Sequence, residues 1–183
     1  MFTIYVDDNT DEEAVNLYRE LSARHKHMDE IEDGVHPMGN TSYKTFEHNE
    51  KHLALKLGVK NDVVKEYFRI NMYKKGFYVH GKSYSRLEKR QQHVITYQKA
   101  GKAEFASVIS FIQSEEQNPN KIINFAFIKE IRKNRPLGCV WEVSIEEDRL
   151  EVIPNQNIVN VNNFMKADNK CFVCPSPNRY DRD

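Results

Sequence analysis

The sequence predicts a mainly β (α+β) fold, a small barrel-like antiparallel sheet of about six or seven strands with an N-terminal helix. From about Val63 onward, short runs of β-branched and aromatic residues alternate with turn residues, as is typical of a barrel or sandwich. Before that point, apolar side chains recur at helical spacing. Of the 183 residues, 39% are hydrophobic and 11% aromatic, enough for one domain plus an extension.

The first 34 residues are predicted to form an acidic helical arm. Thr10 and Glu13 match a capping box, in which a hydroxyl and a carboxylate bind backbone N–H groups that the first turn leaves unpaired. Ten acids against three bases give residues 1–34 a net charge of −7. We predict a helix over about residues 11–26, with its apolar positions at Ala14, Leu17, Tyr18 and Leu21.

Residues 35–60 are predicted to be a loop or linker, because Pro37 and Gly39 interrupt them and no period is sustained. Residues 61–174 are predicted to form the β-barrel-like domain. Residues 175–183 are rich in proline and charge, and we expect a loose C-terminal tail.

Two hairpins of this domain are predicted from their turns. EYFRINMY and FYVH flank a turn that ends at Gly76, and HVITYQ and EFASVISFIQ flank a turn that contains Gly101. The runs INFAFIKEI, GCVWEVSI and RLEVIP follow, with a further turn expected at residues 146–148. Residues 158–161 fit either a last strand or a single helical turn.

Composition also narrows the class of protein. No apolar run reaches the roughly 18 to 20 residues of a membrane-spanning helix, and the N-terminus lacks the features of a signal peptide, so we expect a soluble protein without membrane contact. Three cysteines are an odd number, which favours a reducing compartment, nuclear or cytoplasmic, over a disulfide framework.

Two patterns raise the question of metal binding. Cys171 and Cys174 have the spacing of half a zinc site, but Cys139 stands alone. The N-terminal third is rich in histidine, without an HExxH motif. A folded Cys₃His site or a small metal-dependent enzyme is one interpretation; buried free cysteines and solvated surface histidines are the simpler one. The histidines concerned are His25, His27, His36, His48 and His52.

Catalytic signatures are otherwise missing from the sequence: there is no Gly-rich phosphate loop, no GxSxG elbow and no matched pair of carboxylates. We therefore predict that the chain is not an enzyme, with no catalytic residue and no cofactor.

The most suggestive stretch is KKGFYVHGKSYSRLEKRQQH, in which cations interleave with aromatic rings. Residues 60–105 hold eleven bases and four acids, a net charge of +7, although the whole chain has a formal net charge of zero. Cations for phosphates and rings for bases are typical of surfaces that bind DNA or RNA. The candidate nucleic-acid-binding residues are Lys74, Lys75, Lys82, Tyr84, Arg86, Lys89 and Arg90.

Other interpretations of this stretch stay open. A β-hairpin also buries alternate aromatic residues and leaves its lysines in water, with no ligand at all. The basic surface also suits an acidic partner, including residues 7–33 of this chain. A reader or scaffold domain would instead bind a peptide along a strand edge or an aromatic pocket, using Tyr78, Tyr84 and Trp141.

Residues 50–183 resemble the C-terminal region of transposon-derived proteins of the En/Spm-like group, the CACTA–Mirage–Chapaev superfamily. The resemblance lies in Tyr78, the run Gly81–Tyr84 and Arg86, and in EVIPNQNIVNVNNFM and CFVCPSPNRYDRD near the end. It departs from the family at His80-Gly81, where relatives tend to have a polar pair. It implies an accessory β-barrel module, since the DDE-type catalytic domain of such elements lies upstream of this region. It transfers no catalytic or binding residue.

Overall fold

The structure, a computed structural model, describes residues 35–39, 41–84, 92–115 and 122–175. The predicted helix over 11–26, the rest of the acidic arm and most of the predicted tail lie outside these ranges. The helical elements are α2 (His48–Lys56), η1 (Tyr73–Lys75) and η2 (Asn155–Asn157). The strands are β1 (Val35–Pro37), β2 (Ser42–Thr45), β3 (Val63–Tyr67), β4 (Arg69–Met72), β5 (Phe77–His80), β6 (Val94–Lys99), β7 (Lys102–Glu115), β8 (Ile122–Leu137), β9 (Val140–Pro154), β10 (Ile158–Ala167) and β11 (Lys170–Pro175).

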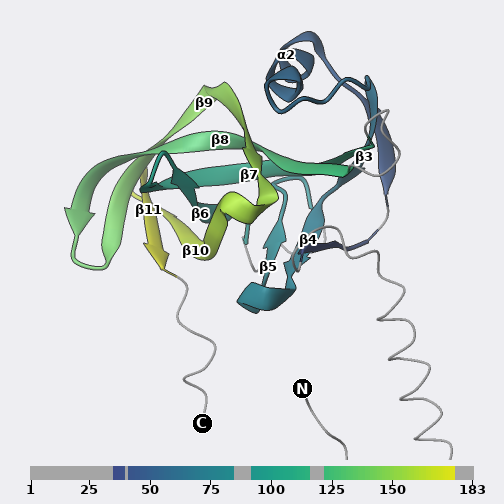
Figure 1. Cartoon of the computed structure of the whole chain (residues 1–183). Helices are drawn as coiled ribbons and strands as arrows, with labels where there is room; N and C mark the ends of the chain where they lie inside the picture. The colour runs from purple at the N-terminus through teal and green to yellow at the C-terminus, as the bar shows by residue number, and fades with distance from the viewer. Residues whose placement is uncertain (1–34, 40, 85–91, 116–121, 176–183) are drawn as a thin grey trace, which may run out of the picture.

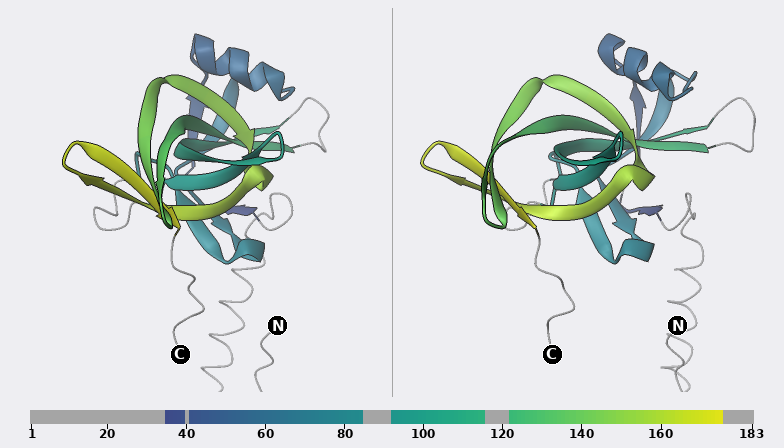
Figure 2. Two further views of the ribbon diagram at one scale, coloured as in Figure 1. Left: turned by 90° about the vertical axis from the view of Figure 1, so that its left-hand side faces the viewer. Right: turned by 60° about the vertical axis from the view of Figure 1, so that its left-hand side comes forward.

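The main element is a closed antiparallel barrel (Figure 1). Its six strands run in the order β7-β6-β10-β11-β9-β8, and β8 pairs back onto β7. Strand β3 adds to the end of β7, and β2 pairs with β3, so the barrel has extra strands beyond the ring. Figure 2 shows the β10–β11 hairpin extending well beyond the body of the barrel. The mainly β prediction is confirmed.

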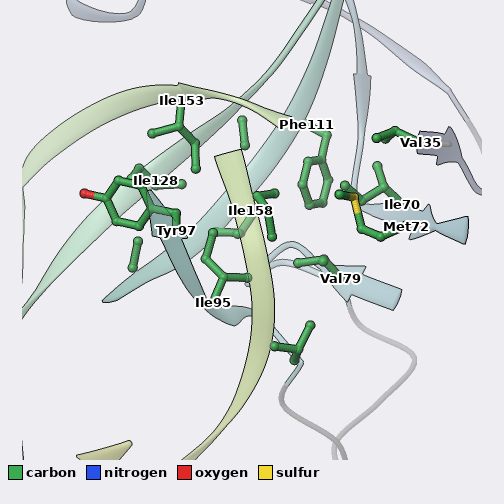
Figure 3. Packing of buried hydrophobic residues seen from close by; sticks show 14 of the residues in the cluster. Val35, Ile70, Met72, Val79, Ile95, Tyr97, Phe111, Ile128, Ile153 and Ile158 are labelled. Carbon is green, nitrogen blue, oxygen red and sulfur yellow. The ribbon is translucent and has the colours of Figure 1, made fainter. Parts of the chain in front are cut away.

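A smaller sheet, in the order β1-β4-β5, packs against the barrel through a shared hydrophobic cluster (Figure 3). Ile70 and Val79 of this sheet meet Ile95, Ile128 and Ile158 of the barrel. All five side chains are 2% exposed or less, so the two sheets share one core. Burial of such side chains is the main stabilising contribution expected here.

Helix α2 covers another part of the barrel. It begins with a capping box formed by Glu47 and Glu50, which satisfies backbone N–H groups of its first turn. Ala54 of the helix belongs to a cluster with Phe125 and Phe127 of β8. Side chains alternate in direction along a strand, so Ala126 and Ile128 fall in the cluster of the small sheet instead. Strand β8 is therefore buried on both faces here.

Both hairpins predicted from their turns are confirmed. Strands β4 and β5 pair across η1, where Gly76 has a φ of 71°. Strands β6 and β7 pair across Ala100 and Gly101, whose φ values of 49° and 78° are those that a tight hairpin turn demands. Residues 158–161, left open between strand and helix, lie in β10.

Three expectations differ from the structure. The described helix, α2, is not N-terminal but lies within residues 35–60, where we expected a linker; β1 and β2 lie there too. The turn predicted at residues 146–148 is wrong, because β9 runs through it. The pairing of β9 with β8 is interrupted between Ile145 and Leu150. The polar residues between these two positions therefore form an irregularity within β9 and do not end the strand.

Candidate functional site

A pocket of about 800 Å³ opens in the barrel, and we call it the barrel pocket. Each of the six barrel strands contributes to its wall. These wall residues are Val94, Ser107, Asn134, Val143, Phe164 and Cys171. Val94 and Val143 belong to a buried cluster with Phe105, Ile131 and Val173, so apolar packing supports the wall. Pockets of this volume hold small molecules or single groups of larger ligands.

One side of the pocket is formed by the segment His80–Tyr84, which four backbone hydrogen bonds hold in place, the first from His80 N–H to the Gln92 carbonyl at 3.0 Å. Gly81 N–H donates to the Phe68 carbonyl at 2.8 Å, and Lys82 N–H donates to the Val108 carbonyl at 2.8 Å. Tyr84 N–H donates to the Gly81 carbonyl at 3.0 Å, which closes a turn. The segment is therefore fixed to the barrel at β7.

This attachment requires glycine at position 81. The β7–β8 register shifts between Val108 and Ser110, which marks a bulge at Ile109. A Cβ atom at Gly81 would lie 2.3 Å from the Ile109 carbonyl oxygen, far inside contact distance. The bulge and the glycine together allow the two backbones to approach closely.

Two pairs of rings line the pocket. His80 and Tyr84 stack with centroids 4.9 Å apart and an interplanar angle of 5°. The ring centroids of His93 and Phe164 lie 6.2 Å apart, with an interplanar angle of 57°. His80 is only 4% exposed, and neither its Nδ1 nor its Nε2 has a hydrogen-bond partner in the described part of the chain. Such a buried polar group is uncommon in folded proteins and calls for an explanation.

Both histidines are held neutral at pH 7. Burial, followed by the nearby charge of Arg69 and by His93, lowers the pKa of His80 to about 4. Burial and the neighbouring Lys82 lower the pKa of His93. A neutral imidazole offers one hydrogen-bond donor and one acceptor. The nitrogens of His80 are closed to solvent, so the half-buried His93 is the ring suited to pair with a polar ligand edge.

The charged residues of the wall are mostly basic. Lys82, Lys166 and Lys170 are exposed and line the pocket together with Glu142. Lys170 forms an ion pair with Glu142 at 3.1 Å. For Lys82 and Lys166, the described residues provide no acidic partner. These two ammonium groups are thus available to an anion in the pocket.

The structure brings only part of the predicted nucleic-acid site together. Lys82 and Tyr84 both line the barrel pocket. Lys74 and Lys75 lie in η1, outside the wall of the pocket. Arg86, Lys89 and Arg90 lie outside the described residues.

Lys75 has a structural contact. Its Nζ donates to the carbonyl oxygens of Gln156, at 3.1 Å, and Ile158, which ties η1 to the start of β10. Partial burial lowers the pKa of this ammonium group.

Sequence reasoning missed the residues that β10 and β11 bring to the pocket. Phe164, Lys166 and Lys170 are more than 80 positions from Lys82, and pairing of β10 with β6 places them nearby. The local signal was the polar turn between two short β runs, where Asp168 and Asn169 adopt positive φ. That turn predicts a hairpin, but it does not predict which side chains of the hairpin face the pocket.

The three aromatic residues of the peptide hypothesis do not gather at one place. Tyr84 lines the pocket, whereas Tyr78 lies under the Arg69 guanidinium, 4.8 Å from the ring centroid. Trp141 packs against Phe105 at 6.5 Å. Each of the other two rings is therefore engaged within the protein.

The structure does not gather the candidate metal ligands into one site, although His48 and His52 lie one turn apart on the same helix. His36 lies in β1, and His48 and His52 lie exposed on α2, whereas His25 and His27 are outside the described ranges. Cys139 is exposed, not buried as the simpler interpretation expected, and Cys171 and Cys174 are half-buried free thiols. In the described ranges, no three histidine, cysteine or acidic residues form a group able to hold a metal ion.

Two further findings concern membrane-spanning helices and similarity to known proteins. No helix in the described ranges has the length and apolar character needed to cross a bilayer. Comparison of the chain with protein-family models, with curated proteins and with solved structures gave no match. The resemblance to transposon-derived proteins stays a prediction from the sequence.

Proposed function

We propose that the chain is a non-catalytic binding module that contacts nucleic acid at the barrel pocket. One observation carries this proposal: the pocket joins Lys82 and Tyr84, from the predicted basic region, to Lys166 and Phe164 of a distant hairpin. Two lysines without an acidic partner in the described residues suit phosphates, and the rings suit bases. The opening in the barrel, not the η1 lysines, is the proposed contact surface.

Binding is expected to fall as salt rises, because each phosphate contact releases counterions. We expect the double variant Lys82→Gln, Lys166→Gln to bind a single-stranded oligonucleotide more weakly. Its plot of log affinity against log salt is expected to be shallower by about 1.4, which is about 0.7 for each lost phosphate contact. Fluorescence anisotropy between about 50 and 200 mM salt measures both quantities.

The matched control is Lys56→Gln, Lys102→Gln, which removes two exposed lysines that do not line the pocket. This control is expected to keep the slope of the unaltered protein. No binding of any oligonucleotide at low salt, or an equal loss in both double variants, would contradict the proposal. Binding of an extended acidic peptide in place of nucleic acid would favour the peptide-reader alternative.

We also propose that the chain derives from the accessory end of a transposon protein. Its support is the set of residues that resemble the En/Spm-like group, of which Gly81, Lys82 and Tyr84 line the pocket. Sequencing of the surrounding gene tests this origin. A DDE-type domain upstream in the same reading frame is the expected result, and an unrelated coding region there would count against it.

A further inference from the structure

We infer that the barrel pocket takes one unpaired nucleotide, with its base stacked on Tyr84 and its phosphate beside Lys82 and Lys166. This inference rests on the proposed function and names the group that the pocket recognises. Its support is the combination of a fixed ring, polar side chains and two cations in the wall of one pocket.

Tyr84 is suited to be a stacking platform. One face of its ring lies against His80, and its backbone N–H is bound to the Gly81 carbonyl at 3.0 Å. The residue is half-buried, so part of it stays accessible from the pocket. A ring that is already ordered loses little conformational freedom when a base extends the stack, so more of the stacking energy contributes to affinity.

The polar groups of the wall distinguish a nucleotide from a simple anion. Gln92, His93 and Asn134 line the pocket with polar side chains, whereas the nitrogens of His80 are buried out of contact with solvent. A nucleobase edge presents both donors and acceptors, as a neutral imidazole does. Inorganic phosphate would use the lysines but neither the rings nor these groups.

The nucleotide has to be unpaired. In a duplex, both faces of a base are covered by its neighbours, so contact with Tyr84 requires a base that is outside the stack. Two sources share this chemistry: a free nucleotide, and one residue of a single strand. Both are tested.

The test removes the base and the ring separately and together. An eight-residue thymidine oligonucleotide is compared with versions in which one, four or all eight positions are abasic, with the unaltered protein and with Tyr84→Ala. We expect the strand that is abasic throughout to bind about ten-fold or more weakly, as does Tyr84→Ala with the intact strand. With both changes present, the second is expected to cost little more, since each removes the same contact.

Two control variants show whether the loss of binding comes from the ring of Tyr84. Tyr84→Phe keeps the ring, so this variant is still expected to bind an abasic strand more weakly than the intact strand. Tyr73→Ala removes a ring that is 69% exposed in η1 and does not line the pocket, and no loss is expected. The abasic series in the unaltered protein needs no variant to fold, so the inference can be tested even if Tyr84→Ala is unstable.

The outcomes separate this inference from the proposed function. Salt-dependent binding that is insensitive to every abasic site would overturn the inference and leave nucleic-acid binding intact. If no oligonucleotide bound, but thymidine monophosphate bound and lost affinity with Tyr84→Ala, the inference would hold for a free nucleotide and the proposed function would fail. Inorganic phosphate that competed as well as the nucleotide would overturn the base contact.

Discussion

Replacement of Gly81 by alanine is expected to lower the free energy of unfolding by about 3 kcal/mol or more. The added Cβ would lie 2.3 Å from the Ile109 carbonyl oxygen. That oxygen belongs to the backbone of a bulge in the barrel, so no side chain can move aside to make room. The segment must shift away from β7, which disturbs the hydrogen bonds of Gly81 to Phe68 and of Lys82 to Val108. Urea unfolding measures the loss.

Gly101→Ala is the matched control for this collision. Gly101 has a φ of 78°, and a Cβ added there would have no other atom within 4 Å, so alanine meets only left-handed backbone strain. That strain costs about 1 to 2 kcal/mol. Equal losses in the two variants would show that the close approach at Ile109 does not limit position 81. If Gly81→Ala still folds, we also expect weaker oligonucleotide binding, because Tyr84 moves with the segment.

Acid is expected to destabilise the protein through His80. The pKa of this side chain is about 4 in the folded state, against an ordinary value of 6.5. Above pH 6.5 the imidazole is neutral in both the folded and the unfolded state, so it contributes no pH dependence. As the pH falls from 6.5 to 4, the unfolded chain binds a proton that the folded protein does not. The free energy of unfolding is therefore expected to fall by about 3 kcal/mol over this window.

His80→Phe tests this assignment, because phenylalanine keeps a ring beside Tyr84 and cannot be protonated. We expect its loss of stability between pH 7 and pH 4.5 to be smaller than that of the unaltered protein. Leu55→Gln, at an exposed position on α2 without a titratable group, is the control and should keep the original pH dependence. His93, whose pKa is also lowered, acts in the same direction and remains in both variants. An unchanged pH dependence in His80→Phe would contradict the assignment.

Strands and short hairpins could be predicted from the sequence because their signals are local. The β6–β7 turn was predicted from Gly101, which adopts the positive φ that the turn chemistry indicates; Ala100 beside it also adopts a positive φ, which the sequence does not indicate. Residues 35–60 were harder to predict because Pro37 and Gly39 mark breaks, although short elements lie on either side of them. Helix α2 carries only one fully buried residue, Ala54, so its apolar pattern is weak.

The candidate site could be predicted only in part. Lys82 and Tyr84 stand out because basic and aromatic residues cluster around them in the sequence. Lys166 and Phe164 have no such neighbours, and their role depends on the pairing of β10 with β6. The stacking of Tyr84 on His80 also depends on a close backbone approach that no local pattern reveals.

By itself, the sequence determined that the described chain is mainly β and where two of its hairpins turn, because backbone preferences and side-chain alternation act over a few residues. Only the tertiary structure decided that β8 closes the ring onto β7 and that six strands share one pocket. Pairing between distant strands is decided by the packing of the whole core. A single bulge at Ile109, with the glycine opposite it, then sets where the ring of Tyr84 lies.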